Sequence, residues 1–160
     1  MDTSLRSCGF AVVEQRGSKH HALEHGRIRN PPTRSVAQSL AEIHKELARV
    51  IDEHAPDAVA VEGIFYCRSV KTALRLGEAR GTVIALSALN ALEVFEYAPK
   101  RVKLAVVGFG AADKSQVAKM VQSMLGLEET PQEDAGDALA IAICHLNARS
   151  QHAALAPKAL

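Results

Sequence analysis

A short apolar segment that ends on a charged residue limits the folds open to this chain. Residues 58–61 read Ala-Val-Ala-Val, and Glu62 follows at once. A continuous apolar run of this length is typical of a strand that is buried on both faces of a sheet. A carboxylate at the end of such a strand loses hydration, which is unfavourable unless a partner compensates. The segment therefore predicts an α/β protein with a helix-covered sheet and an ionisable group at a strand end.

The order of the remaining elements predicts how that sheet is built. Strands are expected over 10–14 and 20–29, on either side of the turn at Gly17, and again over 92–97. Apolar residues at steps of three and four predict a helix after Thr33 or Ser35, and further helices are expected over 70–89, after Asp113, and from Pro131. Residues 100–107 fit either a helix or a strand. Antiparallel strands followed by helix–strand alternation predict a mixed sheet with helices packed against it.

Composition and length set broad limits on the class of protein. A chain of 160 residues suits one domain, expected over 1–150, with a disordered Ala-rich tail over 151–160. The sequence shows no bilayer-spanning apolar run and no secretory signal, so a cytoplasmic protein is expected. Three widely spaced cysteines lack a metal-binding spacing and are interpreted as reduced thiols. The net charge of +1 neither requires nor excludes a nucleic-acid partner, because binding needs a basic face rather than a basic total.

Four carboxylates stand out by their positions. Asp2 precedes the first hairpin, Glu62 ends the buried strand, and Asp134 and Asp137 are three residues apart on one helix face. Magnesium favours a few carboxylates together with water and substrate phosphate, so a cluster of these acids would suit phosphodiester hydrolysis with two metal ions. Spacing alone leaves the alternative open that they are four ordinary surface acids.

Six segments, in order along the chain, resemble the motifs of the RuvC family of Holliday junction resolvases. They are DTSLRSCGFAVV at 2–13, VEGIF at 61–65, LRLGEARG at 74–81, FEYAP at 95–99 followed by Val102-Lys103, VVGFGAADKSQV at 106–117 and DAGDALAIA at 134–142. Each motif is modestly specific, whereas the ordered set is strongly so. The resemblance implies an RNase H-like mixed sheet flanked by helices, and a homodimeric endonuclease that nicks two opposed strands of a four-way DNA junction during recombination and repair.

The resemblance also implies roles for particular residues. The metal ligands would be Asp2, Glu62, Asp134 and Asp137, holding Mg²⁺ with Mn²⁺ expected to substitute, and one of them would also orient the attacking water. Lys114 matches a position near the scissile phosphate, where a cation offsets transition-state charge. Lys103 and Phe65 match positions that contact the DNA backbone and the junction bases. A branch-migration helicase is implied as a partner.

The chain departs from the family pattern at its start. The family has several apolar residues before its first Asp, whereas only Met1 stands there in this sequence, so the first strand is expected to be truncated. Thr3-Ser4 replaces the usual Pro-Gly or Pro-Ser, a mild change because Ser also suits turns.

Several readings stay open from the sequence. The helix over 70–89 is apolar on more than one face, which fits a dimer interface, favoured by the resemblance, or a helix inside the monomer core. Arg75 and Arg80 are candidates for DNA contact or for local pairing with Glu78 and other acids. Phe65 fits a core position as well as a DNA contact. A different RNase H-like nuclease and a non-catalytic nucleic-acid-binding protein remain the alternative functions.

Overall fold

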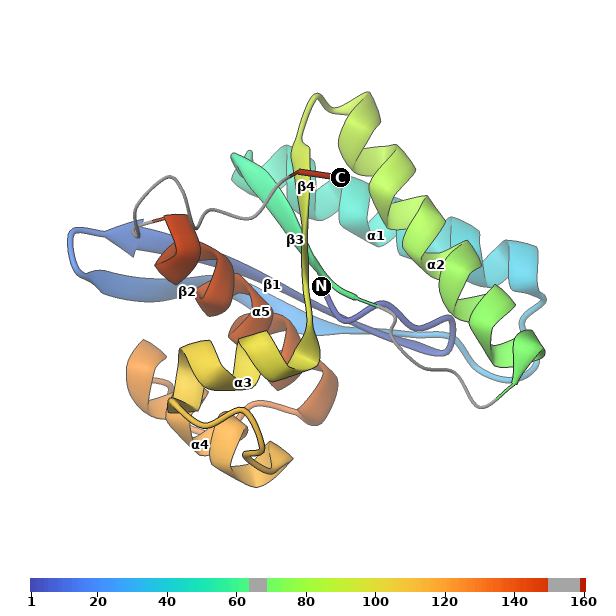
Figure 1. Ribbon diagram of the computed structural model, residues 1–160. Coiled ribbons are helices and arrows are strands. Elements are labelled where there is room, and N and C mark those ends of the chain that lie inside the picture. Colours follow the sequence, from blue (N-terminus) through green and yellow to red (C-terminus); the bar gives the residue numbers. More distant parts are fainter. Residues whose placement is uncertain (64–68, 150–158) are drawn as a thin grey trace.

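The computed structural model describes residues 1–63, 69–149 and 159–160. Within them lie four strands and five helices (Figure 1), which are β1 Ser7–Arg16, β2 Lys19–Arg29, α1 Val36–His54, β3 Ala58–Glu62, α2 Val70–Leu89, β4 Glu93–Tyr97, α3 Pro99–Val107, α4 Lys114–Leu125 and α5 Glu133–Arg149. The predictions for Phe65 and for 151–158 lie outside the described residues. Ala159 forms an isolated antiparallel bridge with Phe95 of β4.

The strands form an antiparallel pair, β1 with β2, and a parallel pair, β3 with β4, as the order of elements predicted. Two residues at the N-terminus connect the pairs. The Met1 amine donates to the Ala60 carbonyl over 2.8 Å, and the Glu62 amide donates to the Met1 carbonyl over 3.2 Å. Asp2 exchanges two backbone hydrogen bonds of 3.0 Å with Gly9. Met1 and Asp2 therefore act as a two-residue strand between β1 and β3.

Helices cover both faces of these strands, and each face has its own apolar core. On one face, α1 and α2 pack against β1, β2, β3 and β4 through a cluster that includes Phe10, Ile43 and Val83. On the other, α3, α4 and α5 pack through a cluster that includes Tyr97, Val121 and Leu139, with Ala11 and Val13 of β1 against it. Figure 1 shows the two groups of helices on opposite sides of the strands.

Local capping explains where several helices begin and end. Ser35 forms a capping box with Gln38 at the start of α1, which decides between the two expected caps. Pro99 occupies the first turn of α3 and Gly108 ends it in the left-handed conformation, so the ambiguous residues 100–107 belong to a helix. Asp113 caps α4 as predicted. None of the described helices is long and apolar enough to cross a membrane.

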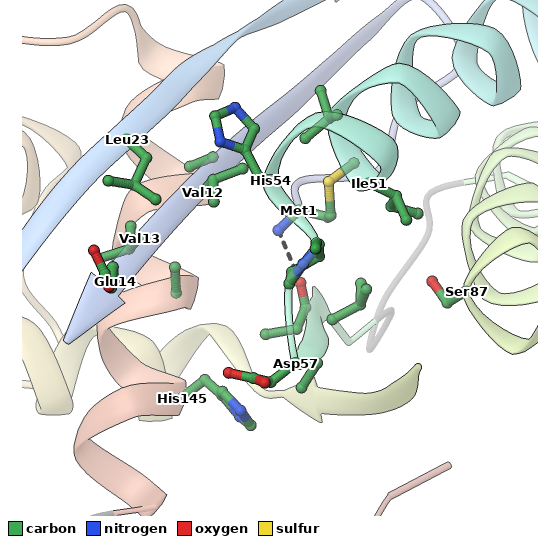
Figure 2. Close-up of a pocket in the computed structure, with 18 of the residues that line it drawn as sticks. Met1, Val12, Val13, Glu14, Leu23, Ile51, His54, Asp57, Ser87 and His145 are labelled. Atoms are coloured by element: carbon green, nitrogen blue, oxygen red, sulfur yellow. Dashed lines mark hydrogen bonds between the residues drawn. The ribbon is translucent and has the colours of Figure 1, made fainter. Parts of the chain in front are cut away.

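A cavity of about 550 Å³ lies beyond the short Met1–Asp2 strand. Its walls include residues 11–15 of β1 and 58–60 of β3, so it runs between the facing edges of the two strand pairs. Figure 2 shows Met1 among the lining side chains, with its amine bonded to the backbone of β3. The Met1 ammonium is buried there, and this burial lowers its pKa.

We expect an apolar extension to occupy this cavity as a strand. The extension would consist of five β-branched residues fused ahead of Met1, and it would pair with β1 and β3. The fusion would also replace the buried Met1 ammonium by a neutral peptide N–H. The melting temperature should rise by about 3 °C or more, since even one buried aliphatic side chain contributes on the order of 2 kcal/mol. A Gly-Ser extension of equal length is the control, and equal melting temperatures for the two fusions would contradict the expectation.

Candidate metal-binding active site

The short N-terminal strand sets Asp2 beside Glu62. Because Met1 bonds to Ala60 and Glu62, it lies level with Val61, and the next residue along, Asp2, lies level with Glu62. Residues that lie level on neighbouring strands point to the same face of a sheet. Both carboxylates are half-buried, and that face is the one covered by α5. The structure thus brings together two acids that are sixty residues apart in the chain.

Helix α5 adds the other two acids. Gly9, which pairs with Asp2, has no side chain to hold α5 away, and a Cβ placed there would lie 1.9 Å from the carbonyl oxygen of Asp134. The N-terminal turn of α5 therefore rests directly on the strand next to Asp2. Asp134 and Asp137 are both half-buried. Helix packing against a glycine, rather than any sequence spacing, determines how closely these carboxylates approach Asp2.

Burial and mutual repulsion raise the pKa of two of the acids. Burial is the largest effect on Asp2, followed by the charge of Asp137, and the pKa of Asp2 rises to about 6. The pKa of Glu62 also rises to about 6, again first through burial and then through the charges of Asp2 and Asp137. The charge of Asp134 adds to the effect on Asp2. The four predicted carboxylates thus form one electrostatic group.

Lys114 supplies a positive charge at the edge of this group. It is the first residue of α4, and its Nζ lies 3.2 Å from Oδ2 of Asp137 and 2.5 Å from Oε1 of Glu133. The hydrogen bond to Glu133 raises the pKa of Lys114, with a further contribution from Asp137. The side chain is 64% exposed, so a phosphate approaching from solvent can reach it.

The donor set fits divalent cations. Carboxylate oxygens are the ligands that magnesium and manganese accept most readily, and a bound cation would relieve the burial and repulsion that raise the two pKa values. The carboxylate oxygens of the four acids do not all lie within 4.8 Å of one another, the spacing that marks a compact ligand group in the described residues. In phosphodiester-cleaving sites that use two metal ions, the ions lie roughly 4 Å apart, so the ligands of such a site need not all surround one ion.

One compact group of possible ligands lies elsewhere in the described part of the chain. The ligand atoms of Glu24, Glu53 and His54 lie within 4.8 Å of one another. Arg49 already engages this group, at 2.5 Å from Glu24 and 2.7 Å from Glu53, and His54 lies 2.7 Å from Glu24. We interpret the group as an ion-pair network that ties β2 to α1.

The residues expected to contact DNA occupy different surroundings. Arg75 pairs with Glu78 on the same helix over 2.8 Å, which confirms the local pairing considered from the sequence. Arg80 is only 13% exposed at its side chain, donates to the Glu62 carbonyl over 2.8 Å, and forms an ion pair with Glu96. Arg80 therefore links the C-terminal end of β3 to β4 through its contacts with Glu62 and Glu96. Lys103 is half-buried on α3.

Sequence reasoning missed two neighbours of Asp134. Ser7 of β1 donates a hydrogen bond to Oδ2 of Asp134, and Nη1 of Arg27 on β2 lies 3.6 Å from the same oxygen. These residues are more than one hundred positions from Asp134 in the chain, and no motif contains both partners. The one available signal was Gly9, which shows where α5 meets the hairpin.

Comparison with solved structures defines the class of fold. A structure of Thermus thermophilus RuvC in complex with a Holliday junction substrate matches with a TM-score of 0.92 and 32% identity, covering 99% of this chain and 96% of that one. The yeast mitochondrial Holliday junction resolvase Ydc2 shares the fold alone, with a TM-score of 0.61 at 14% identity. The RNase H-like fold implied by the sequence motifs is therefore confirmed.

Sequence comparison then gives the family. The family model described as crossover junction endodeoxyribonuclease RuvC matches residues 1–145. The RuvC protein of Trichlorobacter lovleyi is 47% identical over 147 residues, covering 92% of this chain and 83% of the relative. That of Alkaliphilus oremlandii is 42% identical, covering 91% and 89% respectively. The chain belongs to the RuvC family of metal-dependent nucleases.

Without metal, the acid group should make stability depend on pH. The pKa of Glu62 is about 6 in the folded protein, whereas its ordinary value, which applies to the unfolded chain, is 4.5. Between these two pH values the folded protein therefore binds more protons than the unfolded chain. Stability falls as pH rises from about 4 to about 6 and is level above that. Glu62→Gln removes the unfavourable charge, so at pH 7.5 in EDTA we expect it to raise the free energy of unfolding by about 1 kcal/mol, after allowing for its partial exposure.

Urea denaturation of both proteins at pH 4 and pH 7.5 measures this effect. The difference between variant and wild type should be small at pH 4, where the carboxyl group is mostly protonated in both the folded and unfolded states. Glu128→Gln, at an exposed site on the loop after α4, is the matched control. A destabilised Glu62→Gln protein at pH 7.5 would show that the carboxylate charge is already compensated without metal.

Proposed function

We propose that this chain is a Mg²⁺-dependent endonuclease that resolves four-way DNA junctions by paired, symmetric nicks in recombination and repair. The observation that carries the proposal is the convergence of the four acids where α5 crosses Gly9. The similar Thermus thermophilus protein is described in complex with a Holliday junction substrate, which supports the choice of DNA. We expect the protein to act in the cytoplasm.

The residues divide the work of hydrolysis between them. Asp2, Glu62, Asp134 and Asp137 would hold the cations, and one of these acids orients the attacking water. The bound ions supply Lewis-acid chemistry and charge neutralisation at the phosphodiester. Lys114 extends from the start of α4 beside Asp137, where its ammonium group offsets charge that develops on the phosphate oxygens. The same ammonium also limits repulsion between the acids and the approaching DNA.

Surface cations would guide the DNA backbone to these acids. Lys100, Lys114 and Lys119 are exposed around the start of α4, and Lys103 lies on the neighbouring α3. Phosphate contacts of this kind position DNA and carry most of the salt-dependent affinity. Arg75 could give up its ion pair with Glu78 to bind a DNA phosphate. Arg80 would instead hold Glu62 in place through its hydrogen bond to the Glu62 carbonyl. Phe65, just after Glu62, remains our candidate for base contact.

Cleavage and binding should separate on mutation. In a four-way junction assay with Mg²⁺, Glu62→Gln or Asp137→Asn should lower the single-turnover cleavage rate by at least about 100-fold, because a lost ligand charge weakens cation binding. Junction affinity should change less than about threefold, since phosphate contacts hold the DNA. Glu128→Gln provides the control with an equal charge change. Parallel loss of cleavage and affinity would contradict this division of roles, and a wild-type protein that binds junctions without nicking them would indicate a binding protein.

The exposed face of α2 supports a homodimer. Val70 and Leu74 are 78% and 63% exposed, and a Cβ added at Gly77 or Gly81 would meet nothing within 4 Å. These positions follow one another at steps of four, three and four, so they form one stripe along the helix, opposite the buried Ala79, Val83 and Leu86. Small residues let two helices approach closely, and exposed apolar side chains favour coverage by a partner. We propose that two copies pair through this stripe.

A charged residue in the stripe should disrupt the pair. Leu74→Glu would place an unpaired carboxylate in an apolar interface, so light scattering should report a monomer at concentrations where wild type is a dimer. Paired nicking should fall well below single-strand nicking, because symmetric cuts need two linked sites. Lys71→Glu, exposed and off the stripe, is the control. An unchanged mass for Leu74→Glu would place the interface elsewhere.

A motor that moves the junction is the further partner we propose. The family resemblance supports a branch-migration helicase, which would bring preferred sequences to the two active sites.

A further inference from the structure

The arginine beside Asp134 has a position that the four-acid site leaves unexplained. Arg27 pairs with Gly9 across the hairpin, and Gly9 pairs with Asp2. Arg27, Gly9, Asp2 and Glu62 therefore lie level on four adjacent strand segments and share the face under α5. Because Gly9 has no side chain, the N-terminal turn of α5 settles into that place, directly next to Arg27.

Arg27 and Ser7 both contact the same carboxylate oxygen of Asp134. Nη1 of Arg27 is 3.6 Å from Oδ2, and the Ser7 hydroxyl donates to the same Oδ2. Ser7 precedes Gly9 by two residues on β1, so its side chain lies on the same face. The two side chains approach Oδ2 from adjacent strands, Ser7 as a hydrogen-bond donor and Arg27 as an ion-pair partner.

The position of the Arg27 guanidinium is unfavourable for one of its nitrogen atoms. Its Nε is buried and has no hydrogen-bond partner within the described segments. A buried donor left unpaired is unfavourable for folding, and such groups call for an explanation. The side chain is 29% exposed, so the guanidinium could instead extend into solvent. It nevertheless lies next to Asp134.

We propose that Arg27, together with Ser7, is a positioning residue that fixes the carboxylate of Asp134 so that Oδ1 faces the bound cation. This proposal rests on the proposed function, because it assumes that Asp134 is a cation ligand. Hydrogen bonds to the far oxygen of a ligating carboxylate orient the ligand, and losing such a partner typically costs about 10–100-fold in metal affinity or activity. In this role Arg27 would act through Asp134 rather than directly on the cation or the substrate.

Mn²⁺ binding to the DNA-free protein tests the proposal without any cleavage step. Arg27→Met keeps the length of the side chain and removes its charge and donors, and we expect Mn²⁺ affinity, measured by electron paramagnetic resonance, to fall about tenfold. Arg27→Lys keeps the charge and should recover part of that loss. Ser7→Ala should weaken binding in the same direction. Arg29→Met is the matched control, because Arg29 lies two residues along β2 on the same face and is exposed.

The outcomes separate this inference from the proposed function. Asp137→Asn serves as the reference, and if it leaves Mn²⁺ binding intact, the four-acid metal site itself is wrong. If Asp137→Asn weakens binding while Arg27→Met, with an unchanged melting temperature, binds Mn²⁺ as well as wild type or more tightly, Arg27 does not position Asp134. If Arg27→Met fails to fold, wild-type affinity in both Arg27→Lys and Ser7→Ala overturns the proposal.

Discussion

The backbone pairing of two N-terminal residues is the constraint on which the rest of the site depends. Met1 bonds to β3 and Asp2 bonds to β1, so a segment of only two residues joins an antiparallel pair of strands to a parallel pair. The same pairing sets the Asp2 carboxylate level with Glu62. The cavity between β1 and β3 lies next to this connection, and Met1 is among the residues that line it.

The acid group favours the proposed function but lowers the stability of the metal-free protein. Asp2 and Glu62 lose hydration and repel nearby acids, which raises the pKa of both to about 6. Such a group is unfavourable for the folded chain alone and favourable for binding cations. Two positive charges partly offset these effects: those of Lys114, which lies beside Asp137, and of the Met1 ammonium both lower the pKa of Asp2 and Glu62.

The sequence predicted the elements well where local signals were strong. The apolar run at 58–61, the helix over 70–89 and the Asp113 cap all match observed elements. Residues 100–107 stayed ambiguous because their apolar pattern fits both periods, and the capping residues Pro99 and Gly108 decided for a helix. Arg80 illustrates the limit for side chains: the sequence offered DNA contact or pairing with nearby acids, but its partners Glu62 and Glu96 come from separate strands that spacing cannot bring together.

By itself, the sequence determined the class of fold and the family motifs, and it led us to propose the four acids as metal ligands, because periodicity, caps and ordered motifs are local properties of a chain. Only the tertiary structure decided that α5 rests on Gly9, that Asp2 lies level with Glu62, and that Ser7 and Arg27 share one oxygen of Asp134. Those contacts join residues from remote parts of the polymer. Their geometry follows from strand register and helix packing, which act through space rather than along the sequence.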